Sequence, residues 1–202
     1  ADNISAQQLY QSLGYRQFGV FHNYYEDQQL ALRYQKRVHR YHPISGSKLV
    51  PYYRQTTDFT CGPASLMMAI SALAPHYQPE IDEELQLWRE ATTIFMTSGH
   101  GGCGPHGLAL AAHRRGLTAS LVINQLGPLF VNSVRSIEKK QILSRVHQQF
   151  LAQMAEVGMA PCYKHFTLAE LEQGLHHGGL PLVLISTYHL DGRKAPHWVV
   201  VC

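Results

Sequence analysis

Several signatures that would identify a class of protein are missing from this sequence of 202 residues. Charged residues make up only 15% of the chain and the net charge is +3, so the composition does not predict nucleic acid as a partner. No apolar run approaches the ~20 residues that cross a bilayer, so no membrane segment is expected. The residues from Ala1 onward are polar and helix-like, unlike a signal peptide, and a cytoplasmic location is predicted.

The sequence also lacks the cysteine and histidine motifs that are typical of disulfide frameworks and metal sites. The four cysteines form no CxxC pair, and no HExxH motif is present. The cysteines are Cys61, Cys103, Cys162 and Cys202. Without a sign of secretion, we expect free thiols in a reducing compartment. The hydrophobic content of 45% is typical of a globular protein, and the length allows one good core or two small domains.

Composition divides the chain into three zones. Residues 42–48 have the composition of a linker. Residues 1–41 form a segment of their own before it, and residues 49–202 are interpreted as one further domain after it. A basic stretch leads into the linker and contains Arg33, Lys36, Arg37, His39, Arg40 and His42. We interpret this stretch as the solvated end of an element plus the linker, with phosphate binding as the alternative.

Cys61 is the strongest candidate for a nucleophile. The residues from Pro63 to Leu73 predict a helix, because proline suits a first helical turn and apolar residues recur at helical spacing. A thiol at the N-terminus of a helix forms its reactive thiolate more readily. Gln55 precedes it on an irregular turn, from which its amide can reach back over the sulfur as an oxyanion donor. The alternative is a buried cysteine at a helix start, with Gln55 as an ordinary loop residue.

The whole run from Tyr53 to Ser65 resembles the active-site segment of papain-like cysteine peptidases. It is most similar to the family that cleaves double-glycine leader peptides from bacteriocin precursors, in which a glutamine precedes the Cys-Gly-Pro nucleophile at this distance. The resemblance implies an α+β fold, with a helical part and an antiparallel sheet, over residues 49–202. It also implies a peptide or protein substrate, cut after small residues such as Gly-Gly, and no cofactor.

His197 is the predicted second catalytic residue. It precedes an apolar run that predicts a strand, and a strand start at a sheet edge holds an imidazole rigidly across from a nucleophile. Strand alternation places His197 and Val199 on one face and Trp198 on the other. Residues 195–201 resemble the second motif of the same family, a histidine followed by an apolar strand. The alternative is a strand-end histidine satisfied by the backbone.

Members of that family carry a third catalytic residue, an Asp or Asn that orients the imidazole, on a strand after the histidine. Only five residues follow His197 and none is Asp or Glu, so we expect the domain to be truncated at its C-terminus. Asp191 precedes the histidine in a predicted turn and is a poor substitute. A site without its orienting residue loses part of its rate and not necessarily all of it.

Substrate contacts are predicted around the nucleophile at Asp58, Gly62, Gly102 and Cys103. For Asp58, an Asx turn that shapes the loop is the alternative. The many glycines of residues 97–106 predict close approach of a backbone or ligand, so this loop is expected to line the cleft. Cys103 is also a rival nucleophile, because it repeats the Cys-Gly-Pro triplet before a helix, although no glutamine lies within reach upstream.

A zinc site is another interpretation of the same loop. His100, Cys103 and His106 are spaced three residues apart, with His113 further on. A zinc site needs three or four ligands in tetrahedral reach. Because neither CxxC nor HExxH supports it, we predict that the chain holds no metal.

Residues 3–15 carry a second resemblance. Their pattern of Asn, Ala, Leu-Tyr and Leu-Gly-Tyr, followed by two further elements, is similar to the C-terminal motif of the GNAT acetyltransferases. This resemblance implies a partial GNAT-like α/β segment in which Asn3 and Tyr10 contact acetyl-coenzyme A. The pyrophosphate loop of that family would lie before Ala1, so no acetyl transfer is expected from these residues alone. The alternative is an unrelated α/β appendage.

Three functions from different classes remain open for residues 49–202. The first is a thiol peptidase that uses Cys61, His197 and Gln55. The second is a thiol acyltransferase or peptide ligase, which forms the same acyl-enzyme and passes it to an amine. The third is a non-catalytic peptide-binding module. The second and third functions belong to an alternative for the intact protein. In that alternative, a complete GNAT domain acts as an N-acetyltransferase, and residues 49–202 act as the acyltransferase or the peptide-binding module.

Periodicity and turn signals predict helices at residues 3–13, 63–73, 82–95, 107–115, 136–157 and 167–176. Strands are predicted at residues 15–25, 30–38 (a strand or a short helix), 49–53, 117–123, 180–188 and 197–202, with a turn at Asp191-Gly192. Thr167 and Glu170 predict a capping box at the start of the last helix.

Overall fold

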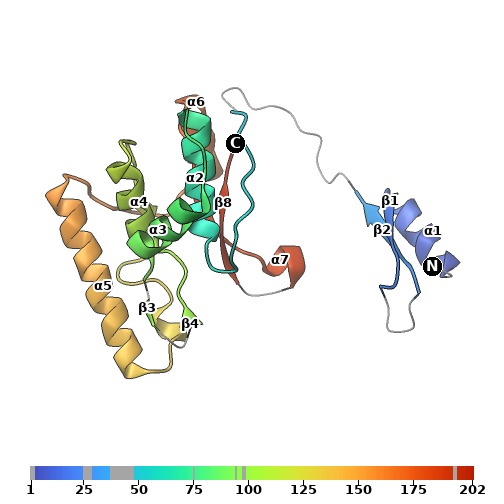
Figure 1. Cartoon of the computed structure of the whole chain (residues 1–202), viewed down its shortest axis with the longest axis horizontal. Coiled ribbons are helices and arrows are strands. Elements are labelled where there is room, and N and C mark those ends of the chain that lie inside the picture. Colours follow the sequence, from blue (N-terminus) through green and yellow to red (C-terminus); the bar gives the residue numbers. More distant parts are fainter. Residues whose placement is uncertain are drawn as a thin grey trace. The chain divides into compact units, whose positions relative to one another are not determined.

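The computed structural model describes residues 3–24, 29–36, 48–74, 76–93, 95–96, 99–192 and 195–202. The chain divides into two units, residues 1–43 and residues 44–202, and the fold is α+β (Figure 1). The predicted linker lies outside the described residues except for Lys48. So do four residues of the basic stretch, Arg37, His39, Arg40 and His42.

The first unit is a helix followed by a hairpin. Helix α1 (Ile4–Ser12) begins after Asn3, whose side chain accepts a hydrogen bond from the Ala6 N–H at 2.9 Å. Strands β1 (Arg16–Phe21) and β2 (Ala31–Gln35) pair antiparallel. The predicted helix and first strand are confirmed, and the element at 30–38 is a strand.

Aromatic rings, not a buried core, hold this unit together. None of its described residues is buried. The Tyr10 ring lies 5.3 Å from that of Tyr34 and 5.5 Å from that of Tyr15, which joins α1 to the hairpin. The Arg33 guanidinium lies over the rings of Phe18 and Phe21.

The second unit is built around helix α2 (Cys61–Leu73), which is apolar on most of its surface. Helices α3 (Ile81–Ala91) and α4 (Pro105–Arg114) pack against it. Gly107 lets α4 approach α3 closely, because a Cβ added there would stand 2.6 Å from the Ala91 Cα. The buried cluster between these helices contains Leu66, Met67, Ile70, Leu87, Ala91, Cys103, Leu108, Ala111, Ala112 and Trp198.

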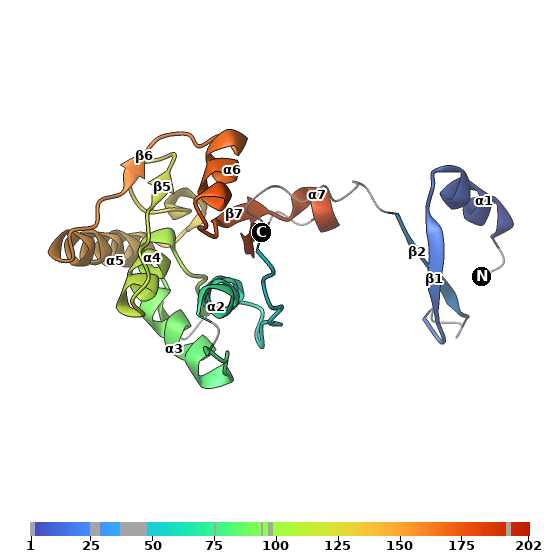
Figure 2. The same cartoon turned by 90° about the horizontal axis from the view of Figure 1, so that it is seen from above.

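A second buried cluster lies on the other side of α4. It joins Leu110 to Phe150 and Met154 of the long helix α5 (Ile137–Glu156). Figure 2 shows α4 between α5 and the pair α2 and α3. Two short strands, β5 (Val122–Ile123) and β6 (Cys162–Tyr163), pair parallel beside this cluster.

The chain ends with a hairpin that lies along α2. Strands β7 (Leu182–Ser186) and β8 (Pro196–Val200) pair antiparallel, with Leu184 opposite Trp198. Helix α6 (Leu168–His176) precedes them, and its predicted capping box between Thr167 and Glu170 is confirmed. None of the helices in the described parts of the chain is long and apolar enough to cross a membrane.

Four local predictions were wrong. No strand forms at residues 49–53, because Pro51 cannot donate to a ladder and no neighbouring strand pairs with the segment. Helix α3 stops at Ala91, because the next two residues pair with a later loop. Thr92 forms a β-bridge with Cys103, and the Thr93 N–H donates to the Gly102 carbonyl. The strand expected at 117–123 shrinks to β5. Instead of a simple turn, Asp191-Gly192 forms the end of a short helix, α7 (Tyr188–Asp191), which stops at Gly192 with a φ of 77°.

Small elements also occur that were not predicted. They are strands β3 (Phe95–Met96) and β4 (Gly99–His100) and the 3₁₀ turn η1 (Val131–Ser133).

Candidate active site

Cys61 is the first residue of α2 and is half-buried. Thr60 occupies the cap position without a side-chain hydrogen bond to the helix, and the first turn contains no acidic residue. The first N–H groups of a helix point out of its N-terminus, and no carboxylate in the first turn of α2 offsets their partial charge. Cys61 therefore lies at the positive end of the α2 dipole.

Strand β8 meets α2 at this same turn. A Cβ added to Gly62 would stand 3.1 Å from Trp198 Cδ1, so the strand touches the helix where glycine leaves room. One turn further, Ser65 Oγ donates a hydrogen bond of 3.1 Å to the Trp198 carbonyl. These contacts fix the start of β8, and with it His197, beside the N-terminus of α2.

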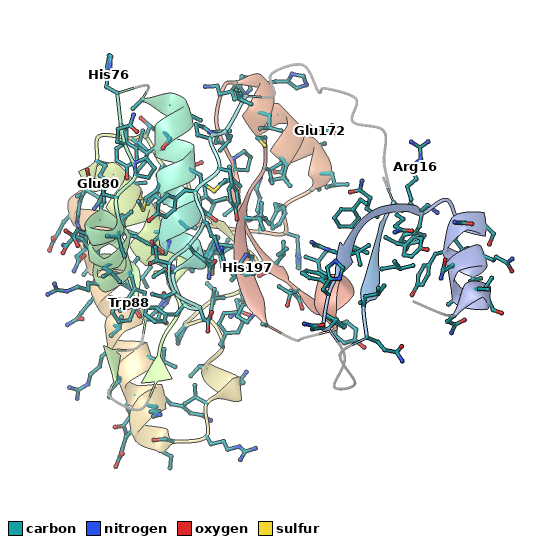
Figure 3. All side chains as sticks on the ribbon, turned by 45° about the vertical axis from the view of Figure 1, so that its right-hand side comes forward. Arg16, His76, Glu80, Trp88, Glu172 and His197 are labelled. Atoms are coloured by element: carbon teal, nitrogen blue, oxygen red, sulfur yellow. The ribbon has the colours of Figure 1, made fainter. Side chains whose placement is uncertain are left out.

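His197 lies opposite Ile185 in the hairpin and is half-buried, whereas Trp198 is buried in the core. Figure 3 shows His197 at the lower end of the hairpin, near the end of α2 where the chain enters the helix. Among the described residues, no hydrogen bond joins the imidazole to the Cys61 thiol. In unliganded enzymes such bonds are often long and tighten only around the substrate.

Gln55 lies in the turn that leads into Cys61. Its amide Nε2 donates a hydrogen bond of 2.7 Å to the Thr57 carbonyl, which also accepts one of 3.2 Å from Thr60 Oγ1. The side chain is thereby folded into the loop next to the nucleophile. A primary amide carries two N–H donors, so one N–H remains for a ligand.

The loop before the nucleophile is attached to α3 at both ends. The fully buried Glu84 carboxylate accepts hydrogen bonds from the Tyr53 hydroxyl at 2.8 Å and the Thr56 N–H at 2.9 Å. One helical turn later, the Trp88 ring lies 4.9 Å from that of Phe59. Sequence reasoning missed both anchors. The spacing of positions 84, 87, 88 and 91 could have revealed them, because residues three and four apart lie on the same face of a helix, here the face of α3 that is turned inward.

Burial raises the pKa of Tyr53 to about 12, and the hydrogen bond to Glu84 and its charge add to this effect. The phenol therefore keeps its proton throughout the range in which proteins are stable. The Tyr53 hydroxyl is thus a permanent donor to Glu84.

Comparison with models of protein families gave a match that covers most of the second unit. Residues 50–202 match the Peptidase_C39 like family. The chain belongs to this family. The papain-like α+β prediction for the C39-like domain is thereby confirmed. Comparison with curated proteins and with solved structures gave no match.

Cys103, the rival nucleophile, lies inside the C39-like domain against Gly62. Its carbonyl accepts a hydrogen bond of 3.0 Å from Trp198 Nε1. Burial, and then the nearby Cys61, raise the pKa of the Cys103 thiol far above its usual range. A thiol held protonated is a poor nucleophile, so the burial of Cys103 favours the half-buried Cys61 as the nucleophile.

The predicted substrate-contact residues fall into two groups. Asp58 and Gly102 are exposed, on the loop before Cys61 and on the loop before α4. Gly62 and Cys103 are buried against each other beneath Cys61. Hydrogen bonds from Trp88 Nε1 and Thr92 Oγ1 to the Gly101 carbonyl hold the second loop against α3.

Two histidines of the zinc interpretation, His106 and His113, lie near opposite ends of α4. His106 is buried against His147 of α5, with ring centroids 4.7 Å apart, and none of the described residues forms a hydrogen bond with its Nε2. His113 is exposed near the other end of α4, and the side chain of His100 lies outside the described part. Within that part, no three His, Cys, Asp or Glu side chains are placed to hold a metal ion.

The residues of the acetyltransferase resemblance lie in the first unit, outside the C39-like domain. Asn3 caps α1, and the partly exposed Tyr10 packs against Tyr15 and Tyr34. All four cysteines of the chain are free thiols, with Cys162 and Cys202 exposed.

Proposed function

We propose that the C39-like domain is a thiol peptidase in which Cys61 is the nucleophile and His197 the general base and acid. One observation carries the proposal. Cys61 begins α2, and the contacts of Gly62 and Ser65 with Trp198 hold the start of β8 beside that same turn. Membership of the Peptidase_C39 like family supports it.

The reaction follows from the placement of these groups. The Cys61 thiolate attacks the carbonyl carbon of a peptide bond, and the carbonyl oxygen becomes an oxyanion. The free N–H of the Gln55 amide and the Cys61 backbone N–H stabilise this charge. His197 transfers its proton to the leaving amine, which breaks the C–N bond and leaves a thioester. Water, deprotonated by His197, then hydrolyses the thioester and restores the thiol.

The proposed substrate is a peptide or protein segment cut after small residues such as Gly-Gly, as the resemblance of residues 53–65 suggests. Asp58 and Gly102 are proposed to contact it, because both are exposed on loops adjoining Cys61. A cytoplasmic location is proposed from the free thiols. The contacts of Asn3 and Tyr10 with acetyl-coenzyme A remain a prediction, since the family match begins at residue 50.

The test measures the alkylation of Cys61 by iodoacetamide as a function of pH. The background is Cys162→Ser/Cys202→Ser, so that the exposed competing thiols are removed. A mechanism that starts from a Cys61 thiolate paired with the His197 imidazolium predicts that alkylation at pH 6 is nearly as fast as at pH 8. His197→Ala should slow the reaction at pH 6 by roughly tenfold or more and leave it similar at pH 9. Cys61→Ala should remain unlabelled.

A hydrolysis assay separates the alternatives. A fluorogenic Gly-Gly-aminomethylcoumarin peptide should be cleaved by the native chain and not by Cys61→Ala. Thioester formation with transfer only to an added amine would favour the acyltransferase. An alkylation profile typical of a free thiol and unaffected by His197→Ala would contradict a catalytic site and favour a peptide-binding module.

A further inference from the structure

We propose that Glu84 is a positioning residue of this active site, which fixes the loop of residues 53–56 and thereby the Gln55 amide. The proposal rests on the proposed peptidase function. Glu84 belongs to α3 and contacts no reacting atom. It is proposed to act through Gln55 alone.

The burial of Glu84 is the first reason. Its exposed fraction is 0%, although carboxylates are almost never fully buried unless they are paired. The neighbouring acids of α3 do have a cationic partner, since Glu83 and Glu90 both pair with Arg115. In the described structure Glu84 has no such ion pair. Its two oxygens are held by neutral donors, which must therefore be well placed.

The identity of those donors is the second reason. Each carboxylate oxygen accepts one hydrogen bond, Oε2 from the Tyr53 hydroxyl and Oε1 from the Thr56 N–H. Both donors come from the same four residues, and they flank Gln55. The buried carboxyl group therefore binds a single stretch of loop and, among the described residues, forms no hydrogen bond with a second helix.

The Thr56 bond acts directly on Gln55. The N–H that Glu84 holds belongs to the peptide unit whose carbonyl is that of Gln55, and this unit is planar. This hydrogen bond holds the chain after the Gln55 Cα, and the bond of the Tyr53 hydroxyl holds the chain before it, so together they restrict the ψ angle of Gln55. The direction in which its Cα–Cβ bond leaves the loop is then set, and the hydrogen bond from Nε2 to the Thr57 carbonyl sets the rest of the side chain.

The far end of the loop is held by the next turn of the same helix. Trp88, labelled in Figure 3, contacts the Phe59 ring and donates from Nε1 to the Gly101 carbonyl at 2.7 Å. The face of α3 that carries Glu84 and Trp88 thus supports both loops that adjoin Cys61. An oxyanion donor acts through preorganisation, and a displacement of about 1 Å can lower a rate ~100-fold.

The test is a double-mutant cycle between Glu84→Gln and Gln55→Ala, assayed on the Gly-Gly-aminomethylcoumarin peptide. Glutamine keeps the shape of Glu84 but loses the charge and one acceptor. We expect Gln55→Ala to lower kcat ~100-fold, as loss of one oxyanion donor does, and Glu84→Gln to lower it roughly tenfold with KM nearly unchanged. The double variant should be no slower than Gln55→Ala. Equal effects of Glu84→Gln in both backgrounds would overturn the proposal.

Matched controls separate positioning from general damage. Glu83→Gln changes the adjacent residue, whose partner is Arg115, and should leave kcat unchanged. Tyr53→Phe removes one of the two bonds and keeps the buried carboxylate, so it tests the same link if Glu84→Gln fails to fold. Alkylation of Cys61 by iodoacetamide forms no oxyanion, so its rate should be the same in Glu84→Gln as in the native chain.

A measurement without catalysis keeps this proposal distinct from the peptidase proposal. The side-chain amide resonances of Gln55 and the exchange of the Thr56 N–H can be followed by NMR. In Glu84→Gln the Gln55 resonances should move toward those of a free glutamine amide and Thr56 should exchange faster, with neither change in Glu83→Gln. If the native chain cleaves nothing but these changes occur, the peptidase function fails and the positioning stands. Unchanged Gln55 resonances would refute the positioning itself.

Discussion

At the scale of single residues, Gly62 decides how closely β8 can approach the nucleophile. The position of a missing Cβ lies 3.1 Å from each of Trp198 Cδ1, Cys103 Cβ and Leu108 Cδ1. Real Cβ contacts are rarely so short, and all three neighbours are buried, so they have little freedom to move. The packing beneath Cys61 therefore depends on glycine at this position.

Gly62→Ala is expected to destabilise the fold and to slow peptide cleavage. Overpacking costs about 1–3 kcal/mol, which outweighs the gain of up to ~1 kcal/mol from the better helix propensity of alanine. Displacement of β8 should separate His197 from Cys61. The free energy of unfolding in urea and the hydrolysis rate measure the two effects. Gly102→Ala is the control for the unfolding measurement, since nothing lies within 4 Å of a Cβ added there.

At this scale, the helix caps that depend only on residues within one helical turn were predicted correctly. Asn3 as a cap and the Thr167–Glu170 capping box follow from the side chains of adjacent residues. Glu84 was not found, because its partners lie 28 and 31 residues away and pairing at such distances leaves no local pattern. The strand expected at residues 49–53 failed for the same reason, since a strand needs a partner that only the folded chain supplies.

At the scale of elements, α4 depends on a pair of buried histidines where it meets α5. Burial, and then the neighbouring His147, lower the pKa of His106 to about 4, and burial lowers that of His147 as well. Both rings are therefore neutral in the folded domain. In the unfolded chain each binds a proton near the ordinary histidine pKa of about 6.5.

The unfolded state thus binds more protons than the folded state between pH 6.5 and about 4. Stability is fully present above this window and falls as the pH decreases through it. We expect a loss on the order of 2 kcal/mol across the window in urea unfolding. His106→Gln should flatten this dependence, although it lowers stability at pH 7. His113→Gln on the exposed side of α4 should keep the native slope, and an equal slope in His106→Gln would contradict the assignment.

At the scale of the whole molecule, the core belongs to one of the two units. Both buried clusters are drawn entirely from residues 44–202, and the family match covers residues 50–202. The helices of this unit, apart from the short α7, were predicted within a few residues, because apolar periodicity reports them directly. The meeting of α2 with β8 followed only from the resemblance of their motifs. No local pattern shows which distant strand will cover a helix.

Removal of residues 1–43 is therefore expected to leave the C39-like domain folded and its site intact. The described residues of the first unit bury no side chain, so they add nothing to the two buried clusters. Residues 44–202 should unfold in urea at the same midpoint as the full chain, within about 0.3 M. They should also show the same pH profile of Cys61 alkylation. A lower midpoint, with faster hydrogen exchange in α2 or β8, would show that the first unit supports the second. In that case its aromatic residues, Tyr10 and Tyr34 among them, would be the first to substitute.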